Sequence, residues 1–580
     1  MKRFCSAFVC VILLVAVVLS CASCDNSGAQ VDKLVVYNSA DYIYDTDLTD
    51  FKEYYFQMTG RQIDVTYVTF DTNETMLTKI TKGDSVVDVV CPSEYAIQKL
   101  LEGGHLVKLN YFDEDGSFVQ SMSKYEGYEH NSDKIDSQII AKIDEAFSDL
   151  TDPNEQTPQK MTDYFVPYMY GTLGILYNKY AFADMGIYNY ETINNANWGI
   201  LFNDDGNGNI LAEGLKGNIL MKDSIRDSYA VTLFYMQESG KLDKLKDKSG
   251  KLYTEMSAGE LINVADEQVL NICREVLTEQ KQQLFGYEVD FGKDDLLKGN
   301  ATVDLAWSGD AMYAVEESWD DYLCPNCMTQ SGVEQGEGDD VTIVCAKCGE
   351  ECGDYELGYY VPHTNGNIWF DGWVVPKTHD PEHIDAIKLF INFLNSPYAA
   401  ANNLIEIGYS SAVSREAVMQ TAHNDEDVRG VLCSAYLVND DSWDKLDEKG
   451  KTVTEFDFDS WEEFEDYFFY YRDEMDNSNW RYPFDIESVD DDYDRSLTTL
   501  GVMRDFGENN KAVVTMWNGA RSKGVSALPL LGWTALAVAV AVGIVVLCEY
   551  IKHHKNATVI IRKADQTEQP NDQTNNISNE

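Results

Sequence analysis

Two pairs of cysteines have the spacing of a metal-binding motif. One pair is Cys324 and Cys327, the other is Cys345 and Cys348, and residues 328–344, 17 positions, lie between them. Four thiolates so spaced are typical of a zinc ribbon, a closed tetrahedral site with a structural rather than a catalytic role. Gly349 suits the tight turn that directs the sulfurs at one ion.

The other cysteines are assigned more simply. Two disulfides are the alternative to zinc at the paired cysteines, because thiols oxidise outside the cell. Cys352 is interpreted as a fifth, free thiol, and Cys91, Cys273 and Cys433 as buried apolar residues. We therefore expect a structural Zn²⁺ at the paired cysteines, and no cofactor for any binding function.

An aromatic ring and a carboxylate form a second candidate pair. Trp369 and Asp371 stand two apart in an extended run, so both project from the same side of the chain. An indole face attracts a cation by ~0.5–2 kcal/mol, and a carboxylate compensates an ammonium group withdrawn from water. Taken singly, a strand Trp is more often part of a core and an Asp before Gly more often part of a turn.

Short β-rich runs alternate with helical runs along the chain. The expected strands and helices of the first part are 34–37, 48–58, 63–70, 74–82, 86–90 and 95–101, in that order. The first two helices end at Gly60 and Gly83. This alternation predicts a parallel sheet with crossover helices, an α/β fold.

Ligands of open α/β sheets bind at the carboxyl ends of strands, which directs attention to residues 38–42 and 92–95. A second α/β stretch runs from 164 to 361 and contains a helical patch at 261–284. Farther on we expect a strand at 371–376 and an amphipathic helix at 384–394. Residues 110–160 are polar and are interpreted as an irregular insertion, and residues 440–494 as an acidic one.

Charge and composition exclude several classes of protein. The 580 residues carry 98 Asp and Glu against 45 Lys and Arg, a net charge of −53, which argues against a nucleic-acid partner. The charge is compatible with a cationic ligand, although an acidic surface commonly reflects solubility alone. Only 8 His occur, and nucleophile elbows and phosphate loops are absent from the sequence, so we expect no enzyme.

Seven segments, in this order, resemble the spermidine/putrescine-binding proteins of bacterial polyamine ABC importers. They are residues 36–43, 69–76, 88–95, 166–172, 304–310, 368–376 and 407–409. The resemblance implies a two-lobed periplasmic-binding-protein type II fold, which clamps its ligand between lobes that close by a hinge. It also implies a polyamine as ligand, and an ABC permease and ATPase as partners.

The residues that match the family's ligand-binding positions are Ser39, Asp41, Tyr42, Ser93, Tyr95, Ser224, Asp227, Trp307, Trp369, Asp371 and Tyr409. Asp371 matches the main amine-binding carboxylate of the family. Ser39 stands where Trp is common, Asp41 where Glu is common, and Ser224 where Asp is common. One carboxylate and one stacking ring are therefore missing or supplied elsewhere, which leaves putrescine, spermidine and another amine as open choices.

The two ends of the chain predict where the protein resides. A basic start and an apolar run at 7–20 read as a signal peptide over 1–21, with lipidation of Cys21 or, alternatively, Cys24. A plain cleaved signal peptide is the other possibility. Residues 525–547 are uncharged and long enough to span a bilayer, and the basic residues at 552–555 place that flank in the cytoplasm.

The resulting domain prediction is lobe 1 at 31–160 and lobe 2 at 161–368, with the zinc-ribbon-like insertion at 322–353. Residues 369–520 return to lobe 1 and carry the acidic insertion, and 556–580 form a disordered cytoplasmic tail. The body is expected outside the cell, anchored by an N-terminal lipid, the C-terminal helix, or both. Two alternatives to a polyamine receptor stay open: a receptor for another small solute, and a membrane-tethered sensor or adhesion protein with the same fold.

Overall fold

The computed structural model describes residues 31–187, 196–318, 322–324, 332–336, 342–354, 356–362, 364–425, 428, 431–432 and 500–522. Several predictions lie outside these residues: the signal peptide with Cys21 and Cys24, Cys327, Cys433, the acidic insertion, the predicted span at 525–547 and the tail. Within the described ranges, no helix combines the length and the apolar character needed to cross a membrane. The chain divides into two compact units, 1–517 and 518–580, and the description below concerns the first.

One mixed sheet of 11 strands organises the body. Its main path runs through β2 (Ile63–Thr69), β1 (Asp32–Asn38), β3 (Val89–Val90), β13 (Gly366–Val374), β4 (Phe165–Asn178), β7 (Val303–Trp307), β5 (Ile219–Lys222) and β6 (Leu284–Glu288). The strands β12 (Leu357–Tyr360) and β14 (Ser410–Ser411) pair with β4, and β15 (Leu500–Gly501) pairs with β13.

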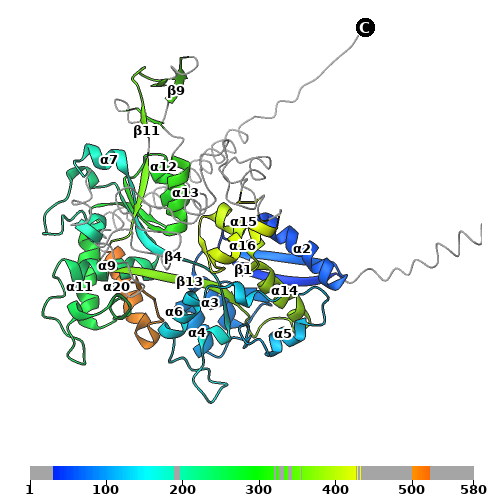
Figure 1. Cartoon of the computed structure of the whole chain (residues 1–580). Coiled ribbons are helices and arrows are strands. Elements are labelled where there is room, and N and C mark those ends of the chain that lie inside the picture. The colour runs from blue at the N-terminus through cyan, green and yellow to red at the C-terminus, as the bar shows by residue number, and fades with distance from the viewer. Residues whose placement is uncertain are drawn as a thin grey trace, which may run out of the picture. The chain divides into compact units, whose positions relative to one another are not determined.

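The prediction of a purely parallel sheet is wrong at the centre. β1 is parallel to β2 and β3, and β5 is parallel to β6 and β7, as crossover helices require. β4 and β13, however, are antiparallel to each other, and they join the two parallel halves. Figure 1 shows both long strands passing between helices of the two halves.

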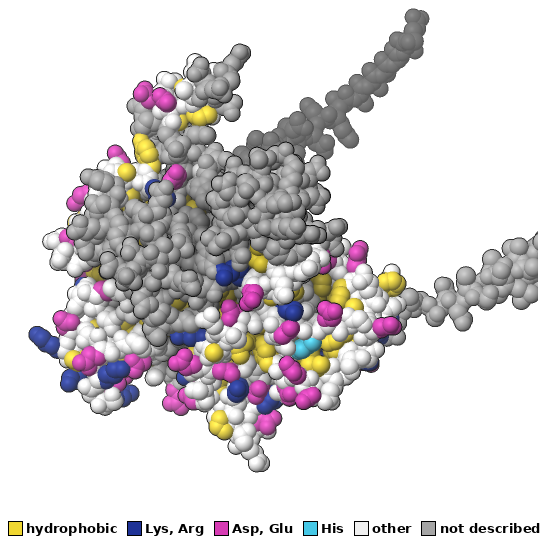
Figure 2. All heavy atoms as spheres, viewed as in Figure 1, with side chains coloured by type: hydrophobic (Ala, Val, Ile, Leu, Met, Phe, Trp, Pro, Cys, Tyr) yellow, Lys and Arg dark blue, Asp and Glu magenta, His cyan; other side chains and the backbone are white. Residues whose placement is uncertain are grey.

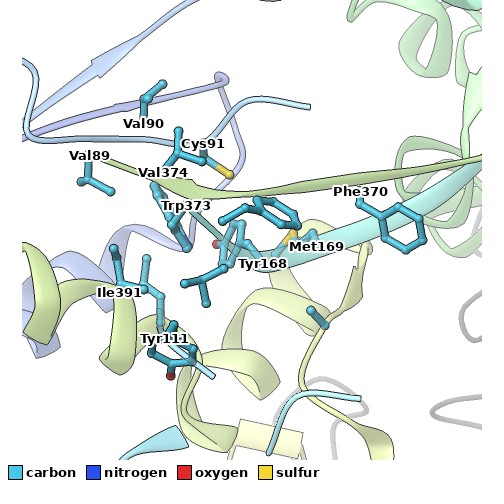
Figure 3. Packing of buried hydrophobic residues seen from close by; sticks show 14 of the residues in the cluster. Val89, Val90, Cys91, Tyr111, Tyr168, Met169, Phe370, Trp373, Val374 and Ile391 are labelled. Carbon is cyan, nitrogen blue, oxygen red and sulfur yellow. The ribbon is translucent and has the colours of Figure 1, made fainter. Parts of the chain in front are cut away.

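Two hydrophobic cores flank these long strands. The first contains buried residues from 34–170 and 368–432 with Leu500 and Val502, and we call this region lobe 1. The second contains buried residues from 176–361, and we call that region lobe 2. In lobe 1 the Trp373 and Tyr168 rings pack with their centroids 5.0 Å apart (Figure 3). The strand β4 contributes to both cores, so it fixes one lobe to the other.

The predicted helices of the first part are confirmed. They are α2 (Asp45–Thr59), α3 (Asn73–Lys82) and α4 (Glu94–Glu102). Gly60 and Gly83 both have φ near +68°, the left-handed conformation that ends a helix at little cost for glycine. The strand predicted at 86–90 pairs only at Val89 and Val90, because Asp88 uses its carboxylate to accept from Val35 N at 2.8 Å.

The interpretation of 110–160 as an irregular insertion is wrong. This stretch forms α5 (Ser117–Met122) and α6 (Ser137–Ala146), whose apolar residues enter the lobe 1 core. Phe118 with Met122, and Ile139 with Ile143, stand four apart, so each pair lies on one helix face despite the polar composition. The helices α14 (Ile384–Leu394, as predicted), α15 (Pro397–Ile407) and α16 (Arg415–Asn424) complete lobe 1.

Lobe 2 is built from shorter helices. These are α7 (Lys179–Asp184), α9 (Ile225–Glu238), α10 (Ala258–Leu261), α11 (Glu267–Gln280), α12 (Gly292–Leu297) and α13 (Ser308–Ser318). The predicted helical patch at 261–284 corresponds to α11 alone, and α20 (Asn510–Ser522) follows β15. The 3₁₀ helices are η1 (Asn131–Lys134), η2 (Met161–Asp163), η3 (Asn197–Phe202), η4 (Glu213–Leu215), η5 (Tyr253–Glu255), η7 (Pro381–His383) and η9 (Gly507–Asn509).

Acidic side chains are distributed over the described part of the face shown in Figure 2, with Lys and Arg side chains among them. They do not gather there into one patch that would mark a docking surface. The search for a functional site therefore turns to the side chains between the lobes.

Candidate ligand-binding site

Three aromatic rings from distant parts of the chain meet on the lobe 1 side. Tyr42 follows β1, Trp369 lies in β13, and Tyr409 follows α15. The Tyr409 ring centroid lies 5.3 Å from that of Tyr42 and 5.4 Å from that of Trp369, both in edge-to-face geometry. This packing requires Gly309, because a Cβ at that position would lie 2.3 Å from the Tyr409 ring. We call Tyr42, Trp369 and Tyr409 the lobe 1 aromatic cluster.

Asp371 supplies a carboxylate to this cluster. Its backbone forms a bridge with Ser93, and its charge raises the pKa of Tyr42 and of Tyr409, each of which is also raised by burial. Burial raises the pKa of Asp371 to about 6, although the hydroxyls of Ser93 and Tyr42 act in the opposite direction. The prediction that Trp369 and Asp371 face the same way is confirmed, since both approach Tyr409.

Three buried polar atoms in this group, Tyr42 Oη, Trp369 Nε1 and Asp371 Oδ1, lack a hydrogen bond of good geometry among the described residues, although Tyr42 interacts with the Asp371 carboxylate. Buried polar groups are almost always paired in native proteins, since an unmade hydrogen bond costs about 1–3 kcal/mol. Several unpaired atoms in one place therefore mark a position where a polar ligand completes the structure.

Asp227 brings a second carboxylate from lobe 2. It lies in the first turn of α9, is 9% exposed, and has a pKa raised by burial. The charge of Asp227 also contributes to the raised pKa of Asp371. Lys222 and Arg226 oppose the rise of the Asp227 pKa, so this carboxylate already has cations of the protein near it, while its negative charge still acts on Asp371.

The lobe 2 side also contains a buried cation, Lys222, at the end of β5. Its Nζ lies 4.2 Å from the centroid of the Trp307 ring and 2.6 Å from Glu288 Oε1. Burial disfavours the charged form of this amine, but Asp304, Glu288 and Asp310 outweigh it and raise the pKa of Lys222. One face of Trp307 is therefore occupied by a cation of the protein itself.

Arg226 is a second buried cation, next to Asp227 in the sequence. Its guanidinium lies 3.9 Å from the Phe506 ring centroid and 5.6 Å from that of Tyr95. One nitrogen, Nη2, donates to Asn263 Oδ1 at 3.0 Å, whereas Nε and Nη1 are buried without a partner among the described residues. Because two of its N–H donors are buried without a partner among the described residues, the Arg226 guanidinium can bind the oxygen of a carboxylate or carbonyl group.

Glu94 completes the group of charged residues on the lobe 1 side. Its Oε2 accepts from Phe370 N at 2.9 Å, and its Oε1 is buried without a partner among the described residues. Burial raises its pKa to about 8, and the positive charge of Arg226 acts against this rise. Sequence reasoning missed Glu94, Lys222 and Arg226, although Glu94 stands between the predicted Ser93 and Tyr95.

The remaining predicted residues lie at the edge of this group. Tyr95 is half-buried, and its hydroxyl donates to Glu74 Oε1 at 3.5 Å. Ser39 is half-buried, and Asp41 is exposed with φ of +49°. The charge of Asp41 contributes to the raised pKa of Lys293. It is not among the causes of the raised pKa of Asp371.

Ser224 has a structural role in addition to any contact with ligand. Its Oγ accepts from Asp227 N at 3.4 Å, which caps the first turn of α9. A serine followed three residues later by an acid is a known start signal for helices, so the sequence contained this information. At the position where Asp is common in the family, this chain has Ser224, which caps α9.

The three predicted zinc ligands that the structure describes also come together. The Sγ atoms of Cys324, Cys345 and Cys348 all lie within 4.8 Å of one another, and Cys327 lies outside the described residues. Cys91 and Cys273 are buried, as predicted. Two cavities elsewhere, of about 350 and 490 Å³, are lined by none of the predicted site residues. The convergence of unpaired atoms, rather than cavity size, therefore identifies the ligand site.

Comparison with known proteins identifies the family of this chain. A family model described as "Bacterial extracellular solute-binding protein" matches residues 49–430, and the chain belongs to that family. The two-domain α/β periplasmic-binding-protein fold is also that of a solved structure from Listeria monocytogenes, a putative spermidine/putrescine ABC transporter. The two are 22% identical with a TM-score of 0.50, and the match covers 85% of this chain and 99% of that one.

Two curated relatives come from Pseudomonas aeruginosa. A putrescine-binding periplasmic protein is 23% identical over 431 residues, which cover 73% of this chain and 89% of the relative. A putrescine/cadaverine-binding protein is 23% identical over 228 residues, which cover 39% of this chain and 51% of the relative. The solute-binding character predicted from the sequence is thereby confirmed at the level of the family.

Proposed function

We propose that this protein is the extracytoplasmic substrate-binding component of an ABC importer and that its ligand is a polyamine such as putrescine or spermidine. The observation that carries the proposal is the unpaired, buried Asp371 Oδ1 within the lobe 1 aromatic cluster, facing the negative charge of Asp227. An ammonium group satisfies both carboxylates, and the adjoining methylenes pack on the rings. The relatives that bind putrescine support the same ligand class.

Calorimetry on the full chain tests this proposal. Putrescine, cadaverine and spermidine should each release heat on binding at neutral pH, whereas a neutral sugar and a dipeptide should not. A chain that binds none of the amines but binds a sugar would refute the proposal. Uptake of radiolabelled polyamine, lost on deletion of the gene, would separate an importer component from a surface sensor with the same fold.

A solute that carries an acid as well as an amine is the second candidate, because Arg226 offers two buried donors that a pure amine cannot use. Ornithine differs from putrescine, and lysine from cadaverine, by one added carboxylate. Comparing the affinities within each pair therefore measures what the carboxylate contributes. Tighter binding of ornithine than putrescine, reversed by Arg226→Met, would favour the second candidate. Putrescine preferred in both variants would favour the polyamine.

We further propose that the chain acts at the outer face of the membrane, with a permease and an ATPase as partners, and that it catalyses no reaction. The membership of an extracellular solute-binding family supports this location. Attachment through Cys21 or through residues 525–547 is a prediction from the sequence. Membrane fractionation of Cys21→Ala, with and without truncation after residue 522, would show which of the two segments retains the protein.

A further inference from the structure

A small insertion separates α13 from β12 in lobe 2, and its described part contains four short strands. They form two antiparallel pairs: β8 (Tyr322–Leu323) with β11 (Gly353–Asp354), and β9 (Gly332–Gln335) with β10 (Thr342–Cys345). Figure 1 shows β9 and β11 in an element that projects beyond α12 and α13. Segments shorter than ~40 residues rarely have enough core to fold without a disulfide or a metal.

Three thiols meet inside this insertion. Cys324 follows β8, Cys345 ends β10, and Cys348 lies in the turn after it. The Sγ atoms of Cys324 and Cys348 are 3.5 Å apart, and all three sulfurs fit within 4.8 Å of one another. Thiolates around tetrahedral zinc stand about 3.8 Å apart for a Zn–S bond of about 2.3 Å. The observed spacing is thus that of ligands around one ion.

The turn after β10 has the backbone geometry that such a site requires. Lys347 N donates to Cys345 Sγ at 3.4 Å, and Gly349 N donates to Cys345 O at 2.8 Å. Gly349 has φ of +75°, which few other residues adopt without strain. Backbone N–H groups directed at a sulfur stabilise the thiolate form that binds metal.

Burial gives a further indication. Cys324 and Cys345 are 0% and 2% exposed although they lie in a small projecting element, whereas Cys348 is exposed. Cys352 N donates to Ile343 O at 2.8 Å, and the Cys352 thiol is hydrogen-bonded to Cys324. Cys352 therefore contacts the group, although it is not one of the three sulfurs that lie within 4.8 Å of one another.

We propose that Cys324, Cys345 and Cys348 bind one Zn²⁺ ion that holds this insertion together. Zn²⁺ is the ion of choice because three thiolates in tetrahedral spacing suit a soft, redox-inert divalent metal. Cys327, which the sequence also predicts as a ligand, lies outside the described residues. A site with three cysteine ligands is typical of structural rather than catalytic zinc.

The test compares two matched substitutions in the full chain, prepared under reducing conditions with equimolar Zn²⁺. Cys348→Ser removes a proposed ligand that is exposed, and Ala346→Ser changes an exposed side chain of the same turn without removing a sulfur. Metal analysis after gel filtration should find one Zn²⁺ per chain in the wild type and in Ala346→Ser. Cys348→Ser should retain less than a fifth of that amount.

Two further readouts keep the result interpretable if the insertion of a variant unfolds. Co²⁺ substituted for Zn²⁺ should give the intense absorption of tetrahedral thiolate coordination in the wild type and lose it in Cys348→Ser. Putrescine affinity should not change in either variant, because the insertion contributes no described residue to the ligand site. Retention of zinc by Cys348→Ser, its loss from Ala346→Ser, or intact-mass evidence of disulfides among these cysteines in protein purified without reductant would overturn the proposal.

Discussion

The two sides of the ligand site handle charge in opposite ways. On the lobe 1 side, Asp371 and Glu94 each keep one carboxylate oxygen buried and unpaired among the described residues. On the lobe 2 side, Lys222 lies 2.6 Å from Glu288 and its charge is stabilised by Asp304 and Asp310, although both Asp304 oxygens are also buried without a hydrogen-bond partner among the described residues. Lobe 2 therefore supplies a cation to its own acids, whereas no cation is among the groups that shift the pKa of Asp371 in lobe 1.

This difference gives the two tryptophans of the site unequal roles. Trp369 and Trp307 each match a ligand-binding position of the family, but a lysine of the protein already lies over the Trp307 ring. Asp227 is the acid of lobe 2 that interacts with Asp371, and it is the group through which lobe 2 can respond to a bound cation.

Replacement of Lys222 should have the largest effect, and the effect should fall on stability. Lys222→Met leaves Glu288 and Asp304 without their cation at a site that is 1% exposed, whereas Asp310 keeps Lys293 at 3.0 Å. Removal of one partner from a buried ion pair typically costs about 3–5 kcal/mol. Urea unfolding should show this loss, with Lys248→Met, an exposed lysine, as the control. An unchanged midpoint would refute internal compensation in lobe 2.

Replacement of Asp371 should act on binding. Asp371→Asn keeps the shape of the side chain but removes the charge that faces the ligand, so diamine binding should weaken by about 2–5 kcal/mol. Stability should change little, since the amide oxygen of Asn can still accept from Ser93 and Tyr42, which interact with the native carboxylate. Calorimetry gives the affinity, and Asp385→Asn, in the first turn of α14, serves as the control. Equal affinities of Asp371→Asn and wild type would remove Asp371 from the site.

The two tryptophans allow a direct comparison of the lobes. Trp369→Leu should weaken amine binding by about 0.5–2 kcal/mol through the loss of a cation–π face. Trp307→Leu should have the smaller effect, because Lys222 already occupies one of its faces. Both affinities come from the same titration. If Trp307→Leu costs more than Trp369→Leu, lobe 2 contributes the main stacking surface and the comparison is reversed.

The pH dependence of binding should be modest and have a defined sign. Burial raises the pKa of Asp371 to about 6, so the empty site is largely protonated at pH 5 and ionised at pH 7. A cation requires the ionised form, so affinity should fall about tenfold from pH 7 to pH 5, with proton release on binding near pH 6. Titrations in buffers of different ionisation enthalpy measure this release. Asp371→Asn should remove the change of affinity with pH that the titration of Asp371 causes. If the affinity of this variant still changes with pH, the titrating group is Asp227 or Glu94.

The same pKa has a consequence for the empty protein. A carboxyl whose folded pKa lies above its unfolded value makes the fold less stable as pH rises through that range. Asp371 and Glu94 should therefore lower the melting temperature of the ligand-free chain between pH 5 and pH 8, and saturating putrescine should reduce this loss. Burial also raises the pKa of Asp227, Glu288 and Asp304 in lobe 2, so the share of lobe 1 is the part of this loss that Asp371→Asn removes.

Much of the fold was predictable because local signals agreed with it. Alternating apolar runs, caps and glycine stops determined β1, α2, β2 and α3. The prediction failed in the middle of the sheet, because strand direction depends on the partner and not on the strand's own residues. It also failed at 110–160, where a polar composition concealed apolar residues at helical spacing in α5 and α6.

The sequence by itself determined which residue types could bind a cation or a metal. Trp369 and Asp371 face one way because extended chains alternate, and Cys345 and Cys348 approach each other because a turn joins them. Only the tertiary structure decided which charges stay unpaired. Lys222 reaches Glu288, and Arg226 reaches Phe506, across 66 and 280 positions of sequence, and no local pattern encodes such contacts. Burial, which sets the pKa of Asp371, is likewise a property of the packed lobes.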